Sequence, residues 1–239
     1  MRNLWRAALD LVWPRQCQAC GETRFCVRFA FLCDPCFVSA TRLEPPWCER
    51  CGLPFAGLAG EGHECPNCRG AKLQFERARS AVRFRGVVRR ALHGLKYEKE
   101  HFWAPAIEAW FLEGVARHLA GEQIHVVVPV PLHPARERQR GFNQAALLAR
   151  ALARQYRLPF EPRALERVRA TKTQTHLDRA ERQENLRCAF RVRRPAVVAN
   201  RRVLLVDDVL TTGSTLSECA AVLRAAGATP ALVLTLARG

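Results

Sequence analysis

The sequence predicts an α/β protein in which a parallel sheet flanked by helices follows a small cysteine-rich domain. Two short apolar runs, residues 124–130 and 203–206, suit strands buried on both faces of a parallel sheet. A segment with helical spacing follows each run, as expected where strands alternate with helices. Four C-x-x-C pairs precede both runs. We therefore expect a cysteine-rich domain over residues 1–72, opened by a short helix, and an α/β domain over residues 73–239.

Length and composition set bounds on the class of protein. A chain of 239 residues can bury a full core and has room for one domain plus a smaller appendage. Hydrophobic residues make up 49% of it, which argues against wholesale disorder. No apolar run approaches the roughly 20 residues of a membrane span, and the amphipathic start is too short and interrupted for a secretion signal. We therefore expect a cytoplasmic protein without a membrane span.

The positive charge is concentrated in one part of the chain. The formal net charge is +16, and residues 136–202 hold 18 Lys and Arg against 6 Asp and Glu, a net +12. Such an excess suits phosphorylated ligands or nucleic acid, although a solvated basic surface explains any single arginine equally well. Aromatic residues are sparse among these arginines, so base stacking along a single strand is not strongly indicated.

Eight of the eleven cysteines form the four C-x-x-C pairs. Two thiolates at this spacing can hold one zinc ion from a tight turn, and four complete a tetrahedral structural site. Disulfides are the alternative, but they need an oxidising compartment that nothing else in the sequence supports. We therefore predict two structural zinc ions. Their expected ligands are Cys17, Cys20, Cys33, Cys36, Cys48, Cys51, Cys65 and Cys68.

The cysteine pairs repeat in two halves. A glycine follows the first pair of each half (Gly21 and Gly52), and a proline lies inside each second pair (Pro35 and Pro66). The period of about 31 residues is typical of tandem units and favours two sequential ribbons, each with its own ion. Cross-braced pairing stays open because the intervals between pairs are similar. The ribbons could be purely structural or could also contact nucleic acid or a partner.

The α/β domain begins with a predicted strand over residues 78–84, a helix over 87–97 and an amphipathic helix over 102–119. Lys96, near the end of the first helix, could meet a pyrophosphate. A lysine closing a helix is also favoured by the helix dipole alone, and the two interpretations are equally good.

The predicted strand over residues 124–130 runs into a stiff, basic loop. Its exit is P-V-P-L-H-P, followed by A-R-E-R-Q-R-G-F-N-Q and a helix rich in Ala and Leu. Prolines stiffen a strand exit, and closely spaced arginines beside a helix start can clamp a diphosphate with bidentate hydrogen bonds. Arg136 and Arg140 are therefore candidate pyrophosphate ligands.

The run 203–206 leads into the most informative stretch of the chain. Asp207 and Asp208 follow it, then a hydroxyl-rich loop with one glycine, and then a helical pattern from Leu216. In open α/β sheets, ligands bind where a strand ends and a helix starts. The sequence has neither a Walker lysine here nor a G-x-G-x-x-G motif, which argues against ATPase and dinucleotide sites. Carboxylates for sugar hydroxyls and loop amides for a phosphate fit a ribose 5-phosphate.

This stretch resembles the phosphoribosyl-pyrophosphate (PRPP) motif of type I phosphoribosyltransferases. The resemblance implies a type I phosphoribosyltransferase-like sheet and two catalytic carboxylates, Asp207 and Asp208, at the ribose hydroxyls. It also implies Mg²⁺ bound together with PRPP, without a dedicated protein cage. The loop residues implied to cradle the 5′-phosphate are Thr211, Thr212, Gly213, Ser214 and Thr215.

The order of the blocks narrows the resemblance to the competence protein F (ComF) family, which includes GntX-type proteins. The shared pattern has a cysteine-rich start, an L-K-Y segment, P-V-P-L-H-P…R-x-R-G-F-N-Q, and V-D-D-V-x-T-T-G. By position, residues of about 163–190 correspond to the mobile hood of phosphoribosyltransferases, with an ordinary surface helix over 178–187 as the alternative. The hood residues implied are Thr171, Gln174 and Arg182.

The resemblance implies two hypotheses about function. One is a transferase that moves the phosphoribosyl group of PRPP onto a nitrogenous acceptor, which nothing in the sequence identifies. The other is a PRPP-responsive, non-catalytic protein that handles single-stranded DNA during natural transformation. For the competence role, the partners implied are single-stranded DNA and the DNA-uptake or helicase machinery.

Overall fold

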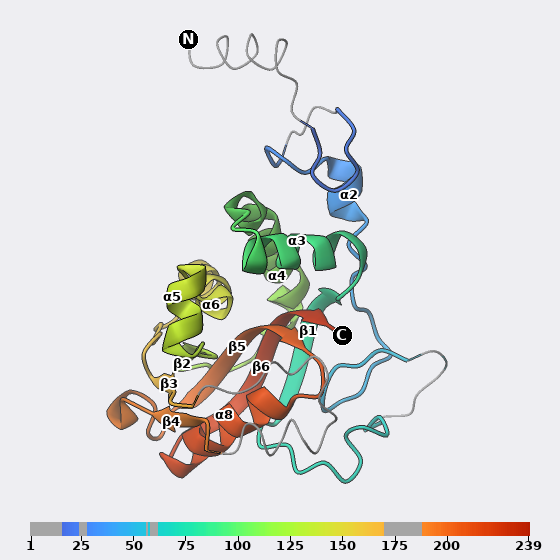
Figure 1. The fold of residues 1–239 in the computed structure, drawn as a ribbon. Helices are drawn as coiled ribbons and strands as arrows, with labels where there is room; N and C mark the ends of the chain where they lie inside the picture. The colour runs from blue at the N-terminus through green and yellow to red at the C-terminus, as the bar shows by residue number, and fades with distance from the viewer. Residues whose placement is uncertain (1–15, 24–27, 56, 58–61, 170–187) are drawn as a thin grey trace.

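The computed structural model describes residues 16–23, 28–55, 57, 62–169 and 188–239 (Figure 1). The described chain forms a central sheet covered by helices, with the cysteine-bearing segments beside it. No helix in this described part is long and apolar enough to cross a membrane.

Four parallel strands form the central sheet in the order β1-β6-β5-β2. The strands are β1 (Arg77–Arg83), β2 (Val126–Pro129), β5 (Arg202–Leu210) and β6 (Thr229–Arg238). β5 lies between β6 and β2, which is the interior position that its continuous apolar run predicts. The predicted parallel sheet is confirmed.

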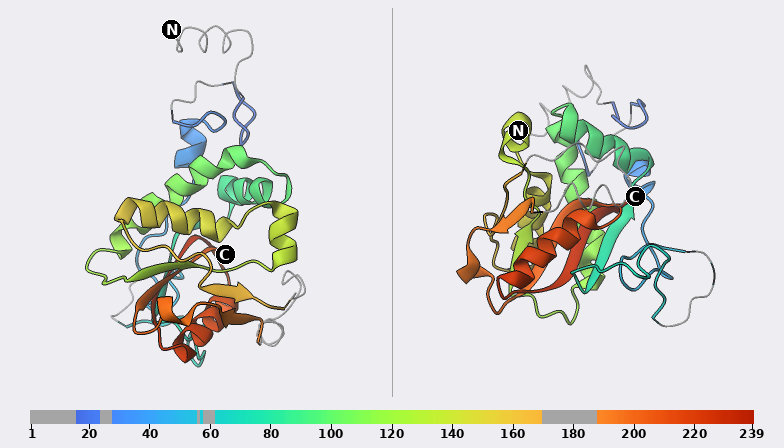
Figure 2. Two further views of the ribbon diagram at one scale, coloured as in Figure 1. Left: turned by 90° about the vertical axis from the view of Figure 1, so that its left-hand side faces the viewer. Right: turned by 60° about the horizontal axis from the view of Figure 1, so that its bottom comes forward.

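Helices cover both faces of the sheet (Figures 1 and 2). One face carries α3 (Gly86–Tyr97), α4 (Ala104–Val115) and α6 (Gln144–Tyr156), and the other carries α8 (Ser214–Ala225). Successive residues of β5 point to opposite faces, so Leu204 packs with the first group and Leu205 packs with α8. Both side chains are fully buried, which explains why the run has no polar alternation.

The remaining elements are short. They are α2 (Asp34–Val38), η1 (His101–Trp103), η2 (Ala116–His118), α5 (Pro134–Arg140), β3 (Leu165–Arg167), β4 (Phe190–Val192) and η4 (Pro195–Val197). Strands β3 and β4 pair antiparallel in a small second sheet.

The segment expected to be an arginine-bearing loop is the helix α5. Pro134 stands at its first turn, where a missing N–H costs nothing, and His133 Nδ1 accepts a hydrogen bond from Ala135 N–H at 3.3 Å. The helix ends at Gly141, whose φ of +84° is the left-handed conformation of a helix C-cap. Arg136 and Arg140 are four residues apart and therefore share one face of α5.

β5 is longer than the predicted run 203–206. It continues to Leu210 along β6, where Asp207 pairs with Thr235. On its other side β2 ends at Pro129, the partner of Val206. The two aspartates therefore lie where β5 has lost one neighbour, which leaves space beside them.

The two cysteine-rich halves pack against different parts of the fold. In the first half, Phe37 of α2 stacks on Trp110 of α4 with ring centroids 5.4 Å apart. In the second half, the Arg50 carbonyl accepts a hydrogen bond from Ala78 N–H of β1 at 2.8 Å. Gly52 has φ +65°, and a Cβ there would lie 2.8 Å from the Ala78 carbonyl oxygen. The second half thus fits tightly on β1, and the division of domains at residues 72 and 73 stays a prediction.

Gly52→Ala should therefore lower the thermal stability more than Gly21→Ala does. Gly21 also has a positive φ (+75°), but nothing lies within 4 Å of a Cβ built there, so it controls for backbone strain. Crowding against Ala78 should cost Gly52→Ala about 1–3 kcal/mol more. Differential scanning calorimetry of the two variants measures the difference, and equal losses would contradict the close packing.

Candidate functional site

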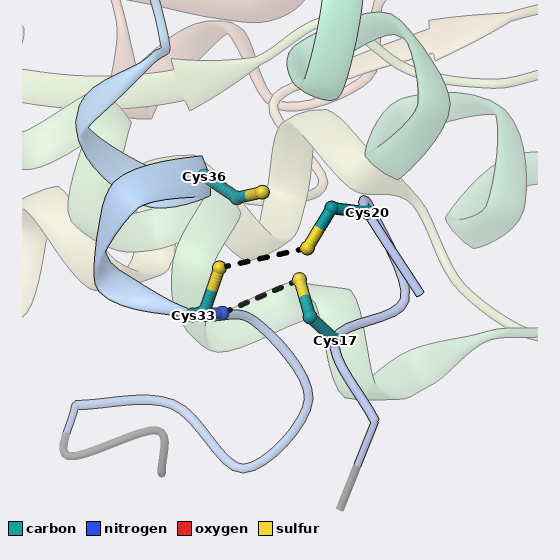
Figure 3. A group of neighbouring side chains, drawn as sticks. All are labelled: Cys17, Cys20, Cys33 and Cys36. Atoms are coloured by element: carbon teal, nitrogen blue, oxygen red, sulfur yellow. Dashed lines mark hydrogen bonds between the residues drawn. The ribbon is translucent and has the colours of Figure 1, made fainter. Parts of the chain in front are cut away.

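The cysteines form two separate clusters, and each takes its sulfur atoms from two consecutive C-x-x-C pairs. Within a cluster the sulfur atoms lie within 4.8 Å of one another, and in the first they turn toward a common centre (Figure 3). The pairing is sequential, as the repeat of the sequence favours. The first tetrad is Cys17, Cys20, Cys33 and Cys36, and the second is Cys48, Cys51, Cys65 and Cys68.

The sulfur spacing fits zinc. The Sγ atoms are 3.9 Å apart between Cys20 and Cys33 and 3.7 Å apart between Cys51 and Cys65. Tetrahedral coordination with Zn–S bonds of about 2.3 Å separates two sulfur atoms by about 3.8 Å, whereas a disulfide would bring them to about 2.05 Å. The Cys65 N–H also points at Cys48 Sγ from 3.3 Å, a donor suited to a thiolate. Both tetrads therefore fit structural zinc.

A cleft of about 390 Å³ opens beside the end of β5. It is lined by residues of α3, α5, α6, β3, β5 and the loop before α8, so segments far apart in the sequence meet there. The predicted site residues that line it are Lys96, Arg136, Arg140, Asp207, Asp208, Thr211 and Thr215.

Two polar contacts hold the acid pair of the cleft, Asp207 and Asp208, in place. Asp207 Oδ1 accepts a hydrogen bond from Asp208 N–H at 2.8 Å. Asp208 Oδ2 forms an ion pair with Lys96 Nζ, and the two side chains are only 14% and 18% exposed. Lys96 therefore balances the charge of the acid pair, besides lying where an anionic ligand could reach it.

The hydroxyl-rich loop is shorter than predicted, because α8 begins at Ser214 and not at Leu216. Gly213 (φ +81°) is the residue before the helix, and Ser214 N–H lies 3.4 Å from Thr212 Oγ1. Thr212, Gly213 and Ser214 form this turn and do not line the cleft, whereas Thr211 and Thr215 do. Contact of the turn residues with a phosphate stays a prediction.

Two cleft residues were not singled out by the sequence. Gln144, at the start of α6, is 3% exposed, and its Oε1 accepts a hydrogen bond from Arg140 Nη1 at 3.0 Å. Its Nε2 has no hydrogen-bond partner among the described residues, so it is a buried donor available to a ligand oxygen. The sequence signal for Gln144 is the residue before it: Asn143 is a preferred helix N-cap, which predicts that Gln144 begins a helix. Arg167 ends β3 and lies in no motif, so only the fold brings it to the cleft.

Comparisons with known proteins decide the family. A family model of the double zinc ribbon domain matches residues 8–69, and one of the phosphoribosyl transferase domain matches residues 140–238. Competence protein F of Haemophilus influenzae is 32% identical over 203 residues, covering 81% of this chain and 85% of that protein. The chain belongs to the competence protein F family.

Other relatives carry two further names. DNA utilization protein YhgH of Escherichia coli K12 is 35% identical over 211 residues, covering 87% of this chain and 90% of that protein. Competence protein ComFC of Bacillus subtilis is 27% identical over 191 residues, covering 77% and 74%. Membership of the competence protein F family confirms the predicted fold class and the double zinc ribbon.

The phosphoribosyl transferase domain model does not cover the whole cleft. Its match begins at residue 140 and so leaves out Lys96 and Arg136, which line the cleft in the structure. The predicted hood residues Thr171, Gln174 and Arg182 lie outside the described residues, and the hood stays a prediction.

Burial, and to a lesser extent the charge of Asp208, raise the pKa of the Asp207 carboxyl from 3.8 to about 8. The charges of Lys96 and Arg167 act in the opposite direction. In the free protein Asp207 therefore holds a proton at neutral pH. Cys219 of α8 lies next to Asp207, and burial raises its pKa as well, so its thiol stays neutral.

Replacing one ligand of the second tetrad should remove one zinc ion. Cys65→Ser should lower the zinc content from two ions per chain to about one, because three thiolates hold the ion less tightly than four. Cys188→Ser, at an exposed cysteine outside both tetrads, is the control and should retain two. Metal analysis by mass spectrometry measures the content, and two ions in Cys65→Ser would contradict the ligand set.

Asp207→Asn should change how stability depends on pH. The wild-type carboxyl has a pKa of about 8 folded against an ordinary 3.8 unfolded, so the folded state loses stability as pH rises from about 4 to 8. The variant lacks this loss. As pH rises, the difference in free energy of unfolding between the variant and the wild type should therefore grow in favour of the variant, by at most about 1.4 kcal/mol per pH unit. Urea denaturation at pH 5 and pH 8 tests this, and a constant difference would contradict a buried, protonated Asp207.

Proposed function

We propose that this chain binds PRPP together with Mg²⁺ in the cleft at the end of β5. The observation that carries the proposal is that acids, hydroxyls and cations from separate segments line one cavity. Its charged residues are four cations (Lys96, Arg136, Arg140 and Arg167) and two acids (Asp207 and Asp208), a formal balance of +2. This balance suits an anionic ligand that also carries hydroxyl groups.

The ribose 5-phosphate half of PRPP fits the β5 side of the cleft. Asp207 and Asp208 can accept hydrogen bonds from the 2′ and 3′ hydroxyls, which favours the ionised form of both carboxylates. Thr211 and Thr215 can donate hydroxyl hydrogen bonds to the 5′-phosphate at the start of α8, a 12-residue helix whose amino end also favours an anion.

The pyrophosphate half fits the cations of the cleft. Arg136 and Arg140 of α5 line it, and so does Lys96 of α3, which pairs with Asp208. Arg140 already donates to Gln144, which fixes one edge of its guanidinium and leaves the other for a phosphate oxygen. The unpartnered Gln144 Nε2 supplies a further donor beside it.

These positions support phosphoribosyl transfer. The bond between ribose C1 and the pyrophosphate oxygen would break, and positive charge would grow on the sugar ring near the two carboxylates. The cations of α3 and α5 would neutralise the pyrophosphate that leaves. Mg²⁺, bound together with PRPP, would add positive charge at the same leaving group. The incoming acceptor would supply the electron pair for the new bond at C1.

A role in DNA uptake is the second part of the proposal. The related proteins carry the names competence protein F and DNA utilization protein. A second cleft of about 640 Å³ adjoins the first and shares Arg140 and Asn143 with it. Its lining also includes Arg150, Arg154 and Phe142, together with two acids, Glu108 and Glu137, so arginines outnumber acids three to two. Basic and aromatic side chains together suit single-stranded DNA, which favours the DNA-handling function as the alternative to transfer.

Replacing both aspartates should abolish most of the PRPP affinity. Asp207→Asn with Asp208→Asn removes two charge-assisted hydrogen bonds to the ribose, and we expect binding of Mg²⁺·PRPP to weaken roughly 100-fold. Isothermal titration calorimetry measures the affinity. The control replaces two exposed carboxylates outside the cleft, Glu44→Gln with Glu76→Gln, and should bind as wild type does.

Unchanged affinity in the aspartate variant would refute the site. Release of pyrophosphate when bases and nucleosides are offered would establish transfer. Absence of release, with PRPP binding altered by an oligonucleotide, would favour the DNA-handling function.

A further inference from the structure

The second cysteine tetrad lies against the strand ends that carry the phosphate loop, residues 211–213. Arg238 is the last residue of β6 and is only 8% exposed. Its Nη2 lies 3.8 Å from Cys51 Sγ, within the reach of an N–H···S hydrogen bond. A strand of the α/β domain therefore touches a predicted zinc ligand directly.

The same guanidinium also holds the start of the phosphate loop. Arg238 Nη1 donates to the carbonyl oxygen of Leu210 at 2.9 Å. Leu210 ends β5, and the next residue, Thr211, lines the cleft. The buried Arg238 side chain thus connects Cys51, a predicted ligand of the second zinc ion, to Leu210, the residue just before the phosphate loop.

The charge of the tetrad explains why an arginine stands there. Four thiolates around Zn²⁺ carry a formal charge of −2. A buried arginine needs an anionic partner, because its charge is costly to remove from water. All four cysteines of the second tetrad are buried, so Arg238 meets that charge away from solvent.

A second contact supports the other end of the loop. Leu73 packs against the second tetrad and, together with Phe75, lies within 3.7 Å of a Cβ built on Gly213. Between them, Gln74 N–H donates to Ser217 Oγ in the first turn of α8 at 3.1 Å. The second ribbon therefore braces the phosphate loop at both of its ends.

The first tetrad has different neighbours. In the described part of its ribbon, Phe37 stacks on Trp110, Phe31 contacts Phe102 and Arg28 pairs with Glu113. All three partners belong to η1 or α4, on the face of the sheet opposite α8. The two zinc sites are alike in sequence but touch different parts of the fold.

We propose that Arg238 is a positioning residue through which the second cysteine tetrad, loaded with zinc, fixes the phosphate loop and so sets the affinity for a sugar 5-phosphate. The proposal rests on the proposed PRPP site. Loss of the second zinc ion would loosen the loop, whereas loss of the first would not.

Ribose 5-phosphate and Mg²⁺·pyrophosphate are the probes, because each should occupy one half of the cleft. Arg238→Met removes the hydrogen bonds to Leu210 and Cys51, and a third from Nη1 to the Gly239 carbonyl oxygen, while keeping an unbranched side chain. It should weaken ribose 5-phosphate binding roughly tenfold, the loss expected for one hydrogen bond to a charged group. Pyrophosphate affinity should stay unchanged, and Arg238→Lys should recover part of the ribose 5-phosphate affinity. Calorimetric titration of the zinc-loaded protein measures all of these.

Arg79→Met is the matched control. Arg79 is equally buried and joins the second ribbon to β1 through hydrogen bonds to Glu49, but it does not reach Leu210. It should lower the melting temperature without changing ribose 5-phosphate affinity. Equal weakening of both probes by Arg238→Met, or equal losses in the two arginine variants, would overturn the proposal.

Hydrogen exchange of the loop amides tests the coupling without a ligand. Exchange over residues 211–215 should accelerate in Arg238→Met and in Cys65→Ser but not in Cys33→Ser, which lies in the first tetrad. Unchanged exchange in Cys65→Ser would overturn the inference even if Arg238→Met failed to fold. Failure of the wild-type protein to bind ribose 5-phosphate would instead refute the proposed function, and the exchange result would still decide this inference.

Discussion

The cleft depends on the unequal lengths of neighbouring parallel strands. β5 stays paired with β6 as far as Leu210, but β2 ends at Pro129, opposite Val206. Before this point β5 lies between two neighbours and under helices on both faces, so its side chains are apolar. After it, Asp207 and Asp208 face the space that β2 no longer fills. A longer β2 would fill this space, close the cleft and remove the place where α3 and α5 bring their cations.

The two zinc ribbons show how one sequence pattern can serve two structural purposes. Gly21 and Gly52 occupy equivalent places in the repeat and have similar positive φ angles, but only Gly52 meets another backbone closely. The first tetrad includes an exposed cysteine, whereas every cysteine of the second is buried. The second ribbon thus packs on β1 and touches Arg238 at the end of β6. Under the proposed coupling, this packing makes the order of the phosphate loop depend on metal loading.

Much of the site was predictable because its chemistry is local in the chain. The run 203–206, Asp207 and Asp208 and the loop after them are consecutive, and a buried strand followed by polar residues and a helix start has few alternative structures. The sulfur clusters were predictable for the same reason, since C-x-x-C spacing specifies a metal-binding turn. The prediction of a loop at α5 is wrong, because a proline can stiffen a strand exit or start a helix, and only the structure shows Pro134 in the first turn of a helix.

The sequence by itself determined the parallel sheet, the acid pair at the end of a buried strand and two sets of four thiolates, because each is specified by neighbouring residues. Only the tertiary structure decided which distant residues join them. Arg167 and Gln144 line the cleft because the fold brings the end of β3 and the start of α6 to it, and Arg238 touches Cys51 because β6 ends beside the second ribbon. Such contacts depend on where strands end relative to one another, and no local pattern of residues records that.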